Sequence, residues 1–227
     1  MTLRGLIFDF DGTLADTLPV CTQALREVFE PRLGREVPDA EVRRHFGPSE
    51  EGIIQRFVPG HVNECLEAYL HAYERLHHTY PVEIPGITAM LTRLKRQGLS
   101  LAVVTAKGLE SATISVDHLG LAKYFSLVEV GTPIGERKLG SIGKVVARWS
   151  VDVHDVAYVG DMPIDMRVAK AAGAVPLGAA WLPATPGDAL RRAGAQEVFS
   201  RPRALVRWVE SQARERERAR GSAEANY

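Results

Sequence analysis

Three apolar runs along the chain each end in a polar cluster, and this pattern predicts buried parallel strands. They are residues 5–8, which end before Asp9; residues 99–104, which end before Thr105; and residues 156–159, which end before Gly160 and Asp161. Two weaker runs, residues 126–130 and 174–177, bring the predicted sheet to about five strands.

Between these runs, apolar residues recur at helical spacing. Examples are Ile87, Met90, Leu91 and Leu94, and later Ile142, Val145, Val146 and Trp149. Strands that alternate with helices are typical of an α/β fold with a doubly wound, Rossmann-like parallel sheet, whose ligands bind beyond the carboxyl ends of the strands. The sequence therefore predicts Asp9, Thr105 and Asp161 on one rim of the sheet.

One region breaks this alternation. Residues 16–81 show helical periodicity alone, which predicts an inserted all-helical cap domain beside the rim. The remaining residues, 1–15 and 82–212, form the predicted α/β core domain, followed by a charged C-terminal tail, residues 213–227. For this tail a solvated, fraying helix is favoured over a binding segment.

Composition narrows the classes of partner. The formal net charge is zero, so no field attracts a polyanion, and nucleic acid is not expected as a partner. Two cysteines, Cys21 and Cys65, are too few for a secreted disulfide framework. Because neither a signal peptide nor a membrane span is recognisable, we expect a cytoplasmic protein that does not bind membranes.

The sharpest motif is Asp9-Phe10-Asp11-Gly12-Thr13-Leu14, directly after the first strand. Carboxylates at positions i and i+2 of an extended segment lie on the same side, where they could share a metal and a substrate. A divalent cation would offset their repulsion, and Gly12 would let backbone amides approach a phosphate. The alternative is a capped turn that leads into a helix.

Three further motifs follow the other strands, and each has a structural alternative. Asp161 and Asp165 could complete a metal site, or they could favour a helix N-terminus. Thr105 could place a phosphate or cap a helix. Arg137 and Lys138 could neutralise charge between a phosphate and Asp9, or lie on a solvated surface.

Taken together, these motifs resemble those of the haloacid dehalogenase superfamily: DxDGT, then Thr or Ser, then Lys, then GDxxxD. The insertion is similar to that family's type-one cap, and residues 193–205 are similar to the end of phosphoglycolate-phosphatase-like members. The resemblance implies that Asp9 is the nucleophile and Asp11 the general acid and base. It also implies an Mg²⁺ site made by the Asp9 carboxylate, the Asp11 main-chain carbonyl and Asp161, with Asp165 behind them.

The same resemblance assigns the phosphoryl oxygens to Thr105, the Ala106 amide and Lys138. Close relatives have Lys-Pro where this chain has Lys138-Leu139, so Arg137 and Lys144 stay open as alternatives to Lys138. Ala106 stands where phosphoglycolate phosphatases usually have Asn, which argues against that substrate.

The sequence thus predicts a magnesium-dependent phosphatase of small phosphorylated metabolites, a monomer or homodimer. A phosphomutase of the β-phosphoglucomutase type and a catalytically silent binding module are the alternatives. Gly47, in the loop of residues 45–51, is a candidate for substrate contact from the cap, against an ordinary connecting loop. His71, His77 and His78 are expected on a solvated helix face.

Overall fold

The strands form one parallel sheet in the order β3-β2-β1-β4-β5-β6. The computed structural model describes residues 3–135 and 137–224, with side chains to residue 215. The strands are β1 (Gly5–Phe8), β2 (Ser100–Val104), β3 (Leu127–Glu129), β4 (Val156–Gly160), β5 (Val175–Ala179) and β6 (Glu197–Phe199). The fold is the predicted α/β class, with one strand more than the sequence indicated.

The missed strand, β6, is short and lies at the edge of the sheet, where it pairs with β5 alone. Its first residue, Glu197, is exposed and only Phe199 is buried. Three residues with one buried side chain give too little apolar pattern to predict a strand.

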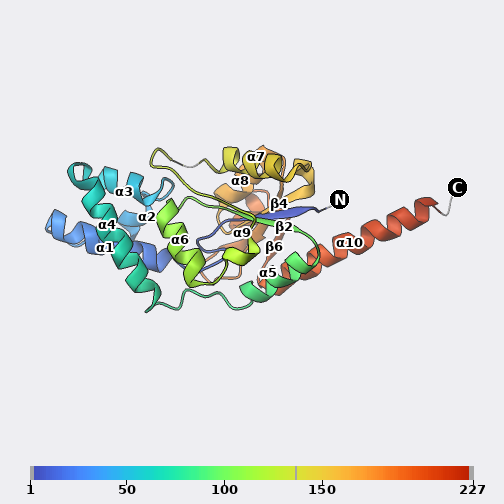
Figure 1. Ribbon diagram of the computed structural model, residues 1–227, viewed down its shortest axis with the longest axis horizontal. Coiled ribbons are helices and arrows are strands. Elements are labelled where there is room, and N and C mark those ends of the chain that lie inside the picture. Colours follow the sequence, from blue (N-terminus) through green and yellow to red (C-terminus); the bar gives the residue numbers. More distant parts are fainter. Residues whose placement is uncertain (1–2, 136, 225–227) are drawn as a thin grey trace.

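Helices cover both faces of the sheet (Figure 1). In the core they are α5 (Ile87–Arg96), α6 (Leu109–His118), α7 (Lys138–Trp149), α8 (Pro163–Ala172), α9 (Gly187–Arg192) and α10 (Pro202–Glu224). Side chains of a strand alternate between the two faces, so Leu6 and Phe8 pack in the cluster with α5 and α10, whereas Ile7 packs in the cluster with α7 and α8. The central strands β1 and β4 are therefore buried at every position.

The insertion contributes the helices α1 (Leu18–Leu33), α2 (Asp39–Arg43), α3 (Glu50–Phe57) and α4 (Val62–His77), which gather at one end of the molecule (Figure 1). Their apolar residues form a cluster of their own, separate from the two clusters against the sheet. Short 3₁₀ turns lie at Pro59–His61, Ala122–Tyr124 and Val153–Asp155.

One prediction about the insertion is wrong. His71 and His78 are exposed, but His77 is only 2% exposed, and its Nε2 lies 3.1 Å from the Ser115 hydroxyl of α6. His77 follows Tyr69 and Tyr73 at four-residue spacing, so it shares the face of α4 that packs on the core. A sequence pattern does not reveal that a second domain covers this face.

The C-terminal helix α10 runs without a break through residue 213, the predicted start of the tail, and extends away from the sheet (Figure 1). Among the described residues, no helix has the length and apolar character needed to cross a bilayer.

Candidate active site

The order of the strands brings Asp9 and Asp161 together. From β1 the chain moves outward through β2 and β3, then returns to place β4 on the other side of β1. Such a reversal opens a crevice at the carboxyl ends of the two strands, where α/β proteins bind ligands. Asp9 follows β1, and its N–H donates to the Val159 carbonyl of β4 (2.9 Å). Asp161 directly follows β4.

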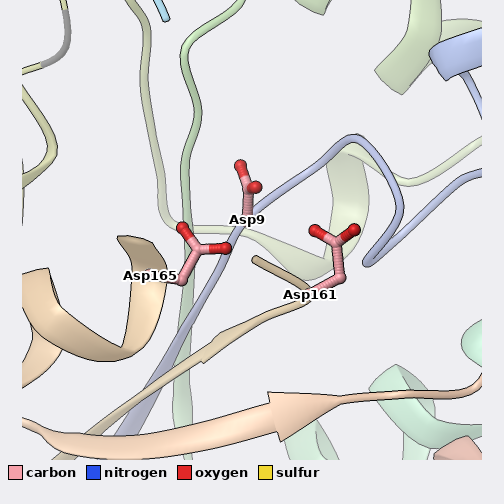
Figure 2. Close-up of side chains that lie close together, drawn as sticks. All are labelled: Asp9, Asp161 and Asp165. Carbon is pink, nitrogen blue, oxygen red and sulfur yellow. The ribbon is translucent and has the colours of Figure 1, made fainter. Parts of the chain in front are cut away.

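Three carboxylates converge at this crevice. Asp9, Asp161 and Asp165 each offer an oxygen within 4.8 Å of the others, and all three residues are buried (Figure 2). Burial and the neighbouring acidic groups outweigh the opposing charge of Lys138, raising the pKa of Asp9 to about 7 and that of Asp161 to about 8. Such a buried, crowded set of oxygens is suited to a hard divalent cation.

Two glycines make room for these carboxylates. A Cβ on Gly12, whose φ is +78°, would lie 2.2 Å from Asp161 Oδ2. A Cβ on Gly160 would lie 2.4 Å from Asp165 Oδ2. Gly12 therefore admits the neighbouring carboxylate, while its own N–H donates to the Ala15 carbonyl (2.8 Å) rather than into the crevice.

Asp165 both caps a helix and lies in the carboxylate cluster. Its Oδ2 accepts the Met162 N–H (3.0 Å) and so caps the start of α8. Its Oδ1 lies 2.7 Å from the Lys138 ammonium. The residue joins the helix end to the carboxylate cluster.

Lys138 is the basic residue of its region that reaches the site. It is buried, and its Nζ lies 3.1 Å from Asp9 Oδ2. Arg137 is exposed, and Lys144 pairs with Glu129 at 3.1 Å on the surface. Of the three basic residues left open by the sequence, the geometry therefore favours Lys138.

The Asp11 side chain faces away from the three-carboxylate cluster. Its Oδ1 accepts a hydrogen bond from the Thr17 hydroxyl and lies 3.1 Å from Lys107 Nζ. The Asp11 carboxylate is therefore directed toward the insertion. The Asp11 carboxylate is not part of the three-carboxylate cluster.

The chain matches the family model of haloacid dehalogenase-like hydrolases over residues 6–179, which span both the insertion and all the carboxylates above. The chain belongs to the haloacid dehalogenase-like hydrolases. The family predicted from the motifs is thereby confirmed.

Curated relatives of this hydrolase are phosphatases by name. The chain is 26% identical over 193 residues to the phosphoglycolate phosphatase of Synechococcus elongatus, covering 79% of this chain and 84% of the relative. It is 26% identical over 214 residues to a Clostridium perfringens protein with the provisional name pyrophosphatase PpaX, covering 92% and 98%. With the family match, these relatives make the chain a phosphatase of this family.

Solved structures share the fold. The structure of CbbY from Rhodobacter sphaeroides in complex with phosphate aligns with a TM-score of 0.73 at 22% identity, covering 88% of this chain and 95% of that one. This likeness supports the α/β fold with its helical insertion.

Two of the predicted phosphate-binding residues of this hydrolase, Thr105 and Ala106, lie at the β2–α6 turn. Thr105 is buried, and its hydroxyl accepts the Lys107 N–H (3.2 Å), as in a capped turn. The Ala106 carbonyl passes so close to Gly131 that a Cβ there would lie 1.9 Å from it. The turn is held firmly beside the crevice.

The space beside Gly47 is open, because a Cβ there would meet nothing within 4 Å. Its φ of +139° favours glycine for the backbone conformation. Further along the same loop, the Ser49 N–H donates to the Thr132 carbonyl of the core (3.0 Å).

Three residues near the site are absent from the sequence-based set. Thr13 is buried and donates to Asp161 Oδ1 (3.4 Å), Lys107 is 2% exposed in its side chain beside Asp11, and Glu50 is buried against the β2–α6 turn. Thr13 lies inside the first motif and Lys107 follows Thr105 and Ala106, so their positions in the sequence could have indicated them. Glu50 has no such signal, since a glutamate in the first turn of a helix is common.

Proposed function

We propose that the chain is a magnesium-dependent phosphatase that hydrolyses phosphate monoesters of small metabolites through an aspartyl-phosphate at Asp9. The observation that carries this proposal is the position of Asp9, buried beside Asp161 and Asp165 with the Lys138 ammonium 3.1 Å away. A carboxylate nucleophile for phosphorus needs such charge compensation, because the phosphate is itself an anion.

The donor set supports Mg²⁺ in this role. Asp9, Asp161 and Asp165 supply oxygen atoms, and the Asp11 carbonyl is the further ligand that the family resemblance suggests. The raised pKa values of Asp9 and Asp161 mean that their ionised forms need a compensating cation. When bound, the ion would supply positive charge that keeps Asp9 ionised and offsets charge on the phosphoryl oxygens.

Different residues of the chain would carry out the separate steps of the reaction. An Asp9 oxygen attacks phosphorus, and the bond to the leaving alcohol oxygen breaks while Asp11 donates a proton to that oxygen. Asp11 then accepts a proton from the water that hydrolyses the aspartyl-phosphate. Lys138, Thr105 and the Ala106 amide hold the phosphoryl oxygens.

A small substrate is expected because the insertion docks at the same edge of the core. Ser49 bonds to Thr132, and Glu50 contacts the β2–α6 turn, so the insertion covers the side of the site that Asp11 faces. The zero net charge argues against a nucleic acid substrate. We infer that the protein acts alone or as a homodimer on a soluble phosphate ester.

The test is release of inorganic phosphate from p-nitrophenyl phosphate and a panel of metabolite esters, with Mg²⁺ and with EDTA. Asp9→Asn should abolish turnover, and Asp11→Asn should slow it about 10²–10⁴-fold. Asp188→Asn, at an 81% exposed aspartate of the core, is the matched control and should keep wild-type activity. Turnover in Asp9→Asn, or activity that EDTA does not reduce, would refute the proposal.

A further inference from the structure

A carboxylate of the insertion is buried in the wall beside Asp11. Glu50 is the first residue of α3 and is 6% exposed. Its Oε2 accepts the Gly108 N–H (2.7 Å), and its Oε1 accepts the Ser111 hydroxyl (2.6 Å). The Lys107 ammonium lies 3.7 Å from Oε1. Glu50 is thus held by an amide, a hydroxyl and a cation of the core.

The cation in this wall is shared between two acids. Lys107 Nζ lies 3.1 Å from Asp11 Oδ1 as well as near Glu50, and it sits 4.5 Å from the centre of the Tyr73 ring. The Lys107 ammonium therefore already pairs with one carboxylate of the core and one of the insertion.

The leaving group of the proposed reaction must lie at this wall. Asp11 can protonate the leaving oxygen only at hydrogen-bond distance, and the Asp11 carboxylate points to Lys107 and Thr17. A carboxylate or phosphate on the leaving group would need unoccupied N–H or O–H donors there. The Gly108 amide, the Ser111 hydroxyl and Lys107 already bind Glu50, so these three donors are not open to an incoming anion. The anion would instead meet the negative charge of Glu50.

A cation of the insertion itself, Arg43, does not change this balance. Its charge opposes the rise that burial causes in the pKa of Asp16, and it pairs with Asp39 at 3.8 Å. It is exposed, so solvent and salt screen its attraction for an anion.

We propose that Glu50 is a specificity-determining residue that excludes anionic leaving groups, so that the substrates are phosphate monoesters of neutral or cationic alcohols. This inference rests on the proposed function. It separates the chain from relatives named for phosphoglycolate, whose leaving group bears a carboxylate.

The experiment compares three esters whose leaving groups each have two carbons: 2-phosphoglycolate (anionic), 2-hydroxyethyl phosphate (neutral) and O-phosphoethanolamine (cationic). With Mg²⁺, wild-type kcat/KM for 2-phosphoglycolate should be at least about tenfold below that for the other two. Glu50→Gln removes the charge and keeps the shape of the side chain. It should raise the ratio of kcat/KM for 2-phosphoglycolate to kcat/KM for 2-hydroxyethyl phosphate by about tenfold. Glu51→Gln, at the exposed neighbouring glutamate, should leave the ratio unchanged.

The outcomes separate this inference from the proposed function. Wild-type preference for 2-phosphoglycolate, equal rates for the three esters, or an unchanged ratio in folded Glu50→Gln would overturn the role of Glu50. The wild-type comparison decides the question even where circular dichroism shows that the variant is unfolded. Absence of magnesium-dependent hydrolysis of all three esters and of p-nitrophenyl phosphate would instead overturn the proposed function, and this inference with it.

Discussion

At the scale of single residues, the charge balance of the site depends on one ammonium group among three carboxylates. Lys138 lies between Asp9 and Asp165, at 3.1 and 2.7 Å. A buried ammonium in that position both lowers the repulsion between the carboxylates and attracts a phosphoryl group. Its long side chain, from the start of α7, reaches a crevice built on other elements.

Replacing Lys138 should therefore impair catalysis more than folding. Lys138→Met keeps the length of the side chain and removes its charge, and kcat should fall about 10²–10³-fold, the usual loss for one preorganised electrostatic group. Lys144→Met is the matched control, because Lys144 lies on the same helix with a 71% exposed side chain. Steady-state kinetics with p-nitrophenyl phosphate measures both. A loss of less than threefold in Lys138→Met would contradict the role.

At the scale of elements, the contact between α4 and α6 joins the insertion to the core. Tyr73 and His77 of α4 both lie near the Ser115 hydroxyl of α6, at 2.8 and 3.1 Å. Burial, with the positive charge of Lys107 and the nearby His118, lowers the pKa of His77 from 6.5 to about 4. The histidine is neutral in the folded protein, and protonating it would place an uncompensated charge in this contact.

This contact gives the stability a defined dependence on pH. Unfolded His77 takes up a proton near pH 6.5, whereas the folded residue resists protonation until about pH 4. The contribution of neutral His77 to the free energy of unfolding is therefore fully present above pH 6.5 and is lost as the pH falls toward 4. His77→Gln should flatten the fall in the free energy of unfolding across that range by about 1–3 kcal/mol.

Urea denaturation at pH 7.5, 6, 5 and 4 measures the difference between wild type and variant. His71→Gln, at an exposed histidine of the same helix, should retain the wild-type slope. Identical slopes for His77→Gln and wild type would show that His77 does not titrate as described.

At the scale of the whole molecule, two separately packed parts meet over one acidic crevice. The insertion has its own apolar cluster, and the core has one on each face of the sheet. Neither depends on the three carboxylates, whose burial disfavours their ionised forms. The molecule thus concentrates unfavourable electrostatics where the proposed cation would bind.

Magnesium should consequently stabilise the whole fold. Because the pKa of Asp161 is raised from 3.8 to about 8, ionising it in the folded protein costs free energy that accumulates between those pH values. At pH 8 without metal, Asp161→Asn should raise the free energy of unfolding by about 1 kcal/mol. Addition of Mg²⁺ to about 5 mM, chosen to saturate the site, should stabilise wild type more than the variant.

Thermal unfolding with MgCl₂ or EDTA provides the measurement, with Asp188→Asn as the control that should respond as wild type does. Equal responses to Mg²⁺ in wild type and Asp161→Asn would place the ion elsewhere.

Much of the fold and site could be predicted because local patterns specify it. The strands β1 and β4 are buried at every position, and β2 is buried after its first residue, Ser100. Their apolar runs made these three strands readable and put Asp9 and Asp161 at the ends of strands. Because parallel strands share one carboxyl edge, the meeting of these residues followed from their place in the chain.

Other features depend on contacts between distant segments. The direction of the Asp11 side chain and the burial of His77 and Glu50 arise where the insertion meets the core. His77 and its partner Ser115 are 38 positions apart in the sequence, and Glu50 and Gly108 are 58 positions apart. A helix pattern indicates which face is apolar but not which partner covers it. The chain's own pattern therefore accounts for the strands and the carboxylates they carry, whereas the wall that would meet the leaving group exists only once the two parts pack together.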